Sequence, residues 1–216
     1  MFDGKEIKGI IFDLDGVICS TDELHYLAWK ALADDIGVYF DREINGRLRG
    51  VSRMASLDII LEKCTKKYTQ SQKEELAGRK NDTYRKLLAG MTHSDVSGEV
   101  RSTLTELSAR GYKLAIGSSS KNAPLILERT DSRKYFDAVS DGNNITRSKP
   151  DPEVFLKAAE FIGLPPQNCL VVEDAEAGID AGVAGGFKTA AIGAAVGYRR
   201  ADIDLKTFSD LLTVLK

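Results

Sequence analysis

The sequence predicts an α/β protein: a doubly wound, Rossmann-like parallel sheet core with an all-helical domain inserted after the first strand. Two patterns lead to this prediction. From residue 93 onward, short apolar β-branched segments alternate with stretches of helical period, which is typical of a parallel sheet covered on both faces. Between residues 21 and 92 only helical periodicity is found. A chain of 216 residues has room for both parts.

The strands and helices follow in a regular order. Five segments are predicted strands: Ile7 to Asp13, Tyr112 to Gly117, Phe136 to Ser140, Cys169 to Glu173 and Lys188 to Ile192. Five helices are predicted in the same half: Glu99 to Arg110, Ala123 to Thr130, Pro152 to Ile162, Ala175 to Ala184 and Thr207 to Leu215. The inserted region is predicted to hold three: Thr21 to Ile36, Arg53 to Lys67 and Gln72 to Leu88. We place the core domain at residues 1–17 and 93–216 and the helical domain at 18–92.

The composition excludes several classes of protein. Apolar residues make up 43% and charged residues 29%, and the net charge of -2 gives no reason to expect nucleic acid. No apolar run reaches the length of about eighteen residues that a membrane span needs, and Met1 to Lys8 is too charged for a signal peptide. We therefore expect a cytoplasmic protein without membrane contact. Three widely spaced cysteines indicate neither a disulfide framework nor a zinc site.

Chemically reactive residue types stand where the predicted strands end. Asp13 and Asp15 follow the first strand, the turn Ser118 to Asn122 follows the second, Lys149 precedes a proline, and Glu173-Asp174 ends the fourth. Ligands bind at the carboxyl ends of parallel strands, so we expect these side chains to converge. Four carboxylates in one crevice repel one another, which favours a divalent cation, and oxygen ligands favour Mg²⁺ over zinc.

This combination predicts phosphoryl transfer. A cation and Lys149 would spread the charge of the transferring group and let an anionic Asp13 attack it. Asp15, two residues later, is placed to protonate the leaving oxygen and to deprotonate an attacking hydroxyl. The hydroxyls and N–H groups of the turn Ser118 to Asn122 suit a phosphate. Each element alone also fits a turn, a helix cap or a solvated surface; their joint occurrence at strand ends favours the site.

These segments resemble the motifs of the haloacid dehalogenase superfamily over nearly the whole chain. The first motif of that superfamily, DxDGxx, matches Asp13-Leu14-Asp15-Gly16-Val17-Ile18. The resemblance implies Asp13 as nucleophile, Asp15 as acid and base, and Ser118 and Lys149 as phosphoryl-binding residues. It also implies an Mg²⁺ ion held by Asp13, Asp15 through its carbonyl, Glu173 and Asp174.

The inserted helices resemble the cap of the β-phosphoglucomutase group. The similarity is carried by Thr21, His25, Arg49-Gly50-Val51-Ser52-Arg53, Arg79-Lys80-Asn81-Asp82 and Ser120-Lys121-Asn122. It implies that the G-V-S-R segment binds the distal phosphate, that Lys80 faces the sugar, and that His25 couples cap closure to Asp15. The implied substrate-binding set is Arg49, Gly50, Val51, Ser52, Arg53, Lys80, Ser119, Ser120, Lys121 and Asn122, with Thr21 and His25 added to the catalytic group.

The resemblance implies a function. We expect an isomerase that interconverts β-D-glucose 1-phosphate and β-D-glucose 6-phosphate through an aspartyl phosphate, with Mg²⁺ as cofactor, glucose 1,6-bisphosphate as intermediate and activator, and a monomeric chain. A sugar-phosphate phosphatase with the same core chemistry is the alternative, and a phosphoaspartate receiver is a remote one. Ser20, Met54-Ala55 and Arg49 depart from the pattern of many relatives, which leaves the fit to a particular sugar phosphate open.

Overall fold

The core of the protein is a six-stranded sheet in which every neighbouring pair of strands is parallel. The computed structural model describes residues 6–48 and 51–215. The strands are β1 (Gly9–Phe12), β2 (Lys113–Gly117), β3 (Ala138–Ser140), β4 (Cys169–Glu173), β5 (Lys188–Ala191) and β6 (Ile203–Asp204), in the spatial order β3-β2-β1-β4-β5-β6. This is the doubly wound order, with β1 beside the point where the direction of winding reverses.

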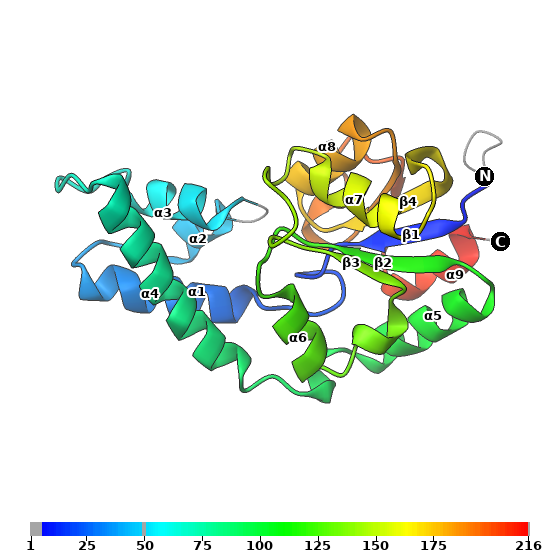
Figure 1. The fold of residues 1–216 in the computed structure, drawn as a ribbon, viewed down its shortest axis with the longest axis horizontal. Coiled ribbons are helices and arrows are strands. Elements are labelled where there is room, and N and C mark those ends of the chain that lie inside the picture. Colours follow the sequence, from blue (N-terminus) through cyan, green and yellow to red (C-terminus); the bar gives the residue numbers. More distant parts are fainter. Residues whose placement is uncertain (1–5, 49–50, 216) are drawn as a thin grey trace.

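Helices cover both faces of the sheet (Figure 1). Ile10 and Phe12 of β1 belong to the same buried cluster as Leu104, whereas Ile11 belongs to the opposite cluster with Phe155. The alternation follows from the period of two along a strand. One face carries α5 (Gly98–Ala109), α6 (Ala123–Arg129) and α9 (Leu211–Val214), and the other carries α7 (Glu153–Phe161) and α8 (Glu176–Ala184). The predicted fold class is confirmed.

In the part of the chain that the structure describes, the α-helices between β1 and α5 form a separate lobe, here called the helical insertion (Figure 1). They are α1 (Asp22–Asp35), α2 (Arg42–Gly46), α3 (Arg53–Leu61) and α4 (Gln70–Leu88). The insertion has its own buried cluster, which includes Trp29, Leu57 and Leu76. In the described residues, no helix is both long and apolar enough to cross a membrane. The domain boundaries at 17/18 and 92/93 stay a prediction.

The insertion also departs from the prediction at two helices. The helix expected from Arg53 to Lys67 ends at Leu61, because the charged stretch that follows has no apolar face to bury. A capping box then starts α4: the Thr69 hydroxyl accepts from the Gln72 N–H at 3.3 Å, and the Gln72 side chain accepts from the Thr69 N–H at 2.9 Å. The five-residue helix α2 was not predicted, since it is too short to show a helical period.

Candidate active site

The two carboxylates of the first motif lie at the carboxyl end of β1. The Asp13 N–H donates to the Val172 carbonyl at 3.0 Å, which extends the β1–β4 pairing by one residue. The chain then turns at Gly16, whose φ of 84° suits glycine and whose N–H donates to the Cys19 carbonyl at 2.8 Å. A Cβ on Gly16 would overlap the Asp174 carboxylate. Glycine therefore allows the turn after β1 to lie directly against the end of β4.

Lys149 lies between two carboxylates. Its ammonium group donates to Asp13 and to Glu173, and its side chain is 2% exposed. Burial disfavours the charge, yet the Asp13 and Glu173 carboxylates raise the pKa of Lys149 above its usual value. Burial raises the pKa of Asp13 well above its usual range, and Lys149 opposes that shift. The negative charges of Glu173, Asp15 and Asp174 reinforce it, so this end of the sheet carries more negative charge than one lysine offsets.

Asp15 is hydrogen-bonded to the helical insertion. The Thr21 hydroxyl donates to the Asp15 carboxylate, and the Tyr84 hydroxyl donates to Thr21 at 3.0 Å. Thr21 stands at the N-cap of α1 without capping it, because its hydroxyl is directed to Asp15. Burial raises the pKa of Asp15 to about 6, and the hydrogen bond from Thr21 opposes this. A carboxyl group with a pKa near neutrality is suited to both gaining and losing a proton.

The turn after β2 is held by its own serines. The Ser118 hydroxyl accepts from the Ser120 N–H at 3.2 Å, and the Ser120 hydroxyl accepts from the Asn122 N–H at 3.2 Å. The Ser119 hydroxyl oxygen is buried and has no hydrogen-bond partner among the described residues. A buried polar atom without a partner is unfavourable. An oxyanion bound at this turn would supply that partner.

The insertion contributes two basic side chains, Lys80 and Arg53. Lys80 is 2% exposed, and its Nζ lies 2.8 Å from His25 Nδ1. The same Nζ lies 4.7 Å from the centroid of the Trp29 ring and 4.5 Å from that of the Tyr84 ring. Burial and the nearby Arg53 charge lower the pKa of Lys80 to about 7. Burial lowers the pKa of His25 well below its usual value, and the positive charges of Lys80 and Arg53 lower it further. Anionic ligands would relieve this crowding of positive charge.

The lowered pKa of Lys80 predicts a pH dependence of stability. The unfolded chain holds this proton up to the usual pKa of 10.5, whereas the folded protein releases it near 7. The unfolded state thus binds more protons between these values, and the free energy of unfolding should rise with pH relative to a Lys80→Met variant. Urea titrations across this window measure the difference. Lys86→Met, an exposed lysine of the same helix, is the control, and a pH-independent difference at Lys80 would contradict the prediction.

The insertion and the core also meet at Asn122. Its side-chain amide donates to the Asn81 side chain at 2.9 Å and accepts from Arg85 at 3.4 Å. Asn122 is a predicted site residue, and Asn81 belongs to the Arg79-Lys80-Asn81-Asp82 segment that carries the resemblance, but neither the contact of Asn81 with Asn122 nor that of Tyr84 with Thr21 was predicted. Asn81 and Tyr84 lie inside α4, and their partners come from other elements far along the chain. The local sequence around each residue does not indicate which distant residue it contacts.

One cavity of about 600 Å³ brings the predicted residues together. Its wall includes Asp13, Asp15, His25, Val51, Ser52, Arg53, Lys80, Ser118, Ser119, Ser120, Lys121, Asn122, Lys149, Glu173 and Asp174. Thr21 does not line the cavity and contacts it through Asp15. Arg49 and Gly50 fall outside the described residues. Trp29 is 2% exposed and belongs to the cavity wall as well as to the buried cluster of the insertion. The volume is that of a small-molecule site.

The donor set is compatible with Mg²⁺. Within residues 6–48 and 51–215, no three acidic, histidine or cysteine side chains form a compact metal-binding group. Both oxygens of Glu173 already accept hydrogen bonds from protein groups. Mg²⁺ is commonly held by one or two carboxylates, with water and substrate phosphate completing the octahedron. Asp13 and Asp174 fit that requirement, and the excess negative charge around Asp13 favours a cation. The full ligand set with Asp15 and Glu173 stays a prediction.

Residues 7–186 match the family model of the haloacid dehalogenase-like hydrolases. The chain therefore belongs to this family of enzymes, and the predicted superfamily resemblance is confirmed. Within the family it is similar to β-phosphoglucomutases. It is 41% identical to the β-phosphoglucomutase of Bacillus subtilis, over 95% of this chain and 92% of that protein. The crystal structure of a β-phosphoglucomutase from Clostridium difficile superimposes with a TM-score of 0.88 at 36% identity, covering 95% and 93% of the two chains.

Phosphatases are also among the relatives. A fructose-1-phosphate phosphatase from Escherichia coli is 30% identical over 85% of this chain and 95% of its own length. The chain is thus similar both to enzymes named as mutases and to enzymes named as phosphatases.

Proposed function

We propose that this protein is a β-phosphoglucomutase that interconverts β-D-glucose 1-phosphate and β-D-glucose 6-phosphate through phospho-Asp13 and a β-glucose 1,6-bisphosphate intermediate. The observation that supports the proposal is one cavity lined by basic side chains from both the core and the insertion. Lys149 donates to Asp13 at the sheet edge, and Ser118 of the core and Arg53 and Lys80 of the insertion line the same cavity. An intermediate with two phosphates, bound either way round, needs a pair of anion-binding sites.

The proposed reaction has two phosphoryl transfers. The C6 hydroxyl of glucose 1-phosphate attacks phospho-Asp13, its proton passes to Asp15, and the phosphorus–Asp13 bond breaks to give the bisphosphate. The bisphosphate rebinds in the opposite orientation. Asp13 then attacks the C1 phosphate, and the departing C1 oxygen takes the proton from Asp15. The pKa of Asp15 of about 6 supports its use in both directions.

The other side chains bind and position the substrate. Lys149 and Ser118 stabilise the equatorial oxygens of the transferring phosphoryl group. Arg53 and Lys121 hold the distal phosphate, and Lys80 faces the sugar hydroxyls. Mg²⁺, when bound beside Asp13 and Asp174, neutralises charge so that an anionic carboxylate can approach the phosphoryl group. Closure of the insertion over the core excludes water, which would otherwise hydrolyse phospho-Asp13.

A coupled assay tests the proposal. β-Glucose 1-phosphate, Mg²⁺ and a trace of glucose 1,6-bisphosphate are added, and the glucose 6-phosphate formed is compared with the inorganic phosphate released. A mutase gives glucose 6-phosphate in large excess. Steady release of phosphate without interconversion would reject the mutase proposal in favour of a sugar-phosphate phosphatase, the activity named for the E. coli relative.

Replacing Arg53 tests the second anion site. Arg53→Ala should lower kcat/KM for β-glucose 1-phosphate by about 10- to 100-fold, since it removes a charged hydrogen bond to the distal phosphate. Arg47→Ala is the matched control, because Arg47 lies outside this cavity and its exposed pair with Glu62 contributes little. Unchanged mutase turnover in Arg53→Ala would reject a two-phosphate site that depends on this arginine.

A further inference from the structure

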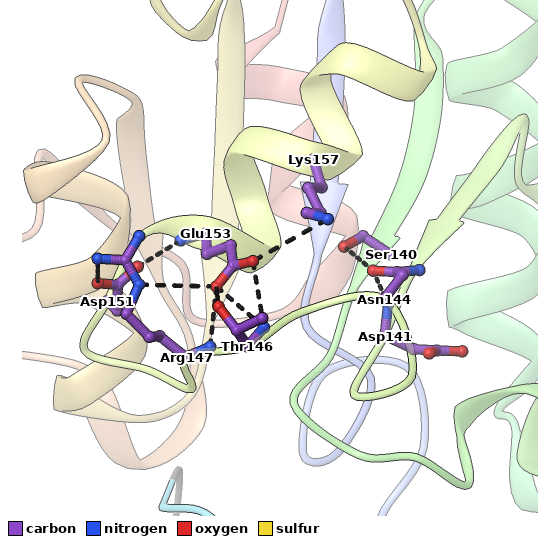
Figure 2. A network of polar contacts seen from close by, with 8 residues as sticks. All are labelled: Ser140, Asp141, Asn144, Thr146, Arg147, Asp151, Glu153 and Lys157. Carbon is purple, nitrogen blue, oxygen red and sulfur yellow. Dashed lines mark hydrogen bonds and ion pairs between the residues drawn. The ribbon is translucent and has the colours of Figure 1, made fainter.

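The loop that carries Lys149 is tied at one end to the first turn of α7. The Glu153 carboxylate accepts from the Arg147 N–H at 2.8 Å, from the Thr146 N–H at 3.0 Å and from the Thr146 hydroxyl at 2.9 Å (Figure 2). Its side chain is only 14% exposed. These are charge-assisted hydrogen bonds to backbone groups, which fix the path of the chain more firmly than an exposed ion pair does.

Further hydrogen bonds link the residues between Arg147 and Glu153 to one another. The Asp151 carboxylate accepts from the Glu153 N–H at 3.0 Å, and the Asp151 N–H donates to the Ser148 carbonyl at 3.1 Å. At the other end of the loop, the Asn144 side chain accepts from the Ser140 hydroxyl at 3.1 Å and from the Asp141 N–H at 3.2 Å (Figure 2). The loop is therefore anchored at β3 and at α7, with a short stretch containing Lys149 between.

The position of Lys149 depends on this short stretch. Its ammonium group must reach Asp13 on β1 and Glu173 on β4 at once, and it passes over the Phe155 ring at 4.7 Å. A lysine has many rotamers, so its buried position requires a fixed backbone. Glu153 holds the two residues that come just before Ser148, and Phe155 follows Glu153 by two positions on the same helix.

We infer that Glu153 is a positioning residue for phosphoryl transfer: it acts through the backbone of Thr146 and Arg147 to hold Lys149 against Asp13. The inference rests on the proposed function, in which Lys149 binds the transferring phosphoryl group. An acidic residue in the first turn of a helix also stabilises the helix itself. If Glu153 had that effect alone, its replacement would leave the rate of phosphoryl transfer unchanged. The two roles therefore predict different results.

The experiment measures how fast the full-length protein forms phospho-Asp13 from acetyl phosphate and Mg²⁺, followed by intact-mass spectrometry. Glu153→Ala should slow this step by about 100-fold, because a displacement of about 1 Å at a catalytic group costs that much. Glu153→Gln, which keeps an acceptor oxygen, should slow it less. In a Lys149→Ala background, Glu153→Ala should have an effect of about twofold or less, since the two residues act on one step.

A matched control separates positioning from stability. Glu99 also stands in the first turn of a helix and accepts hydrogen bonds from the Ser209 N–H and hydroxyl at 3.0 and 2.9 Å. Glu99→Ala should lower the melting temperature as Glu153→Ala does and leave the phosphorylation rate unchanged. Equal rates in Glu153→Ala and wild type, or full additivity with Lys149→Ala, would overturn the positioning role. Failure of the wild type to form an aspartyl phosphate would instead overturn the proposed function and, with it, this role.

Discussion

An Asp13→Asn variant is expected to lose sugar-phosphate turnover by about 10⁴-fold or more, because it removes the nucleophile on which both transfers depend. The amide is nearly the same size as the carboxylate and retains an oxygen that can accept from Lys149. The variant should therefore fold and form no phosphoenzyme with acetyl phosphate. Turnover in the coupled assay and the mass of the intact protein are the two measurements.

The free energy of unfolding of Asp13→Asn is a second measurement, independent of its turnover. Burial raises the pKa of Asp13 well above its usual value, although Lys149 opposes the shift, so ionising Asp13 costs the folded protein more free energy than it costs the unfolded chain. In the absence of divalent cations, Asp13→Asn should not lower the free energy of unfolding. Asp180→Asn, which removes a negative charge that pairs with Arg200 on the outside of the core and keeps an oxygen that accepts from Tyr198, is the control for an acidic residue away from the site. Normal turnover in Asp13→Asn would exclude the aspartyl phosphate.

The core elements could be predicted because their sequence pattern is set by local physical chemistry. β1 and β4 are buried on both faces, which requires continuous apolar runs. β6 has two residues, and its pairing depends on β5 rather than on its own sequence. Near the end of the sequence, the predicted helix from Thr207 to Leu215 is instead a 3₁₀ turn followed by the short helix α9. Elements this short do not show a clear period in the sequence.

Some of the site residues could likewise be predicted from local sequence, and others could not. Residues at strand ends could be predicted to converge, because all strands of a parallel sheet end at one edge, and Asp13, Lys149 and Asp174 do line one cavity. Tyr84 and Glu153 could not be predicted. Tyr84 reaches Asp15 through Thr21 across the junction between insertion and core, and Glu153 acts on backbone N–H groups of its own loop. Such contacts depend on the folded path of the chain.

An Asp15→Asn variant is expected to lower mutase turnover by about 10²- to 10⁴-fold, the usual contribution of a general acid and base. Asparagine retains an oxygen that accepts from Thr21, so the contact with α1 survives. The variant should still form phospho-Asp13 from acetyl phosphate, because acetate leaves without needing a proton. It should then fail to pass the phosphoryl group to β-glucose 1-phosphate. This result separates the proton-transfer role of Asp15 from the nucleophilic role of Asp13.

The pKa of Asp15 adds a stability test with a defined sign. A folded-state pKa of about 6, raised from 3.8, means that the carboxyl contributes stability at low pH that is lost as pH rises through 6. At pH 7, Asp15→Asn should therefore be at least as stable as the wild type, and its advantage should shrink as pH falls toward 4. Urea unfolding at several pH values measures this difference. A variant less stable than the wild type at pH 7, or one that transfers phosphate to the sugar at the wild-type rate, would contradict the assignment of Asp15 as a buried acid and base.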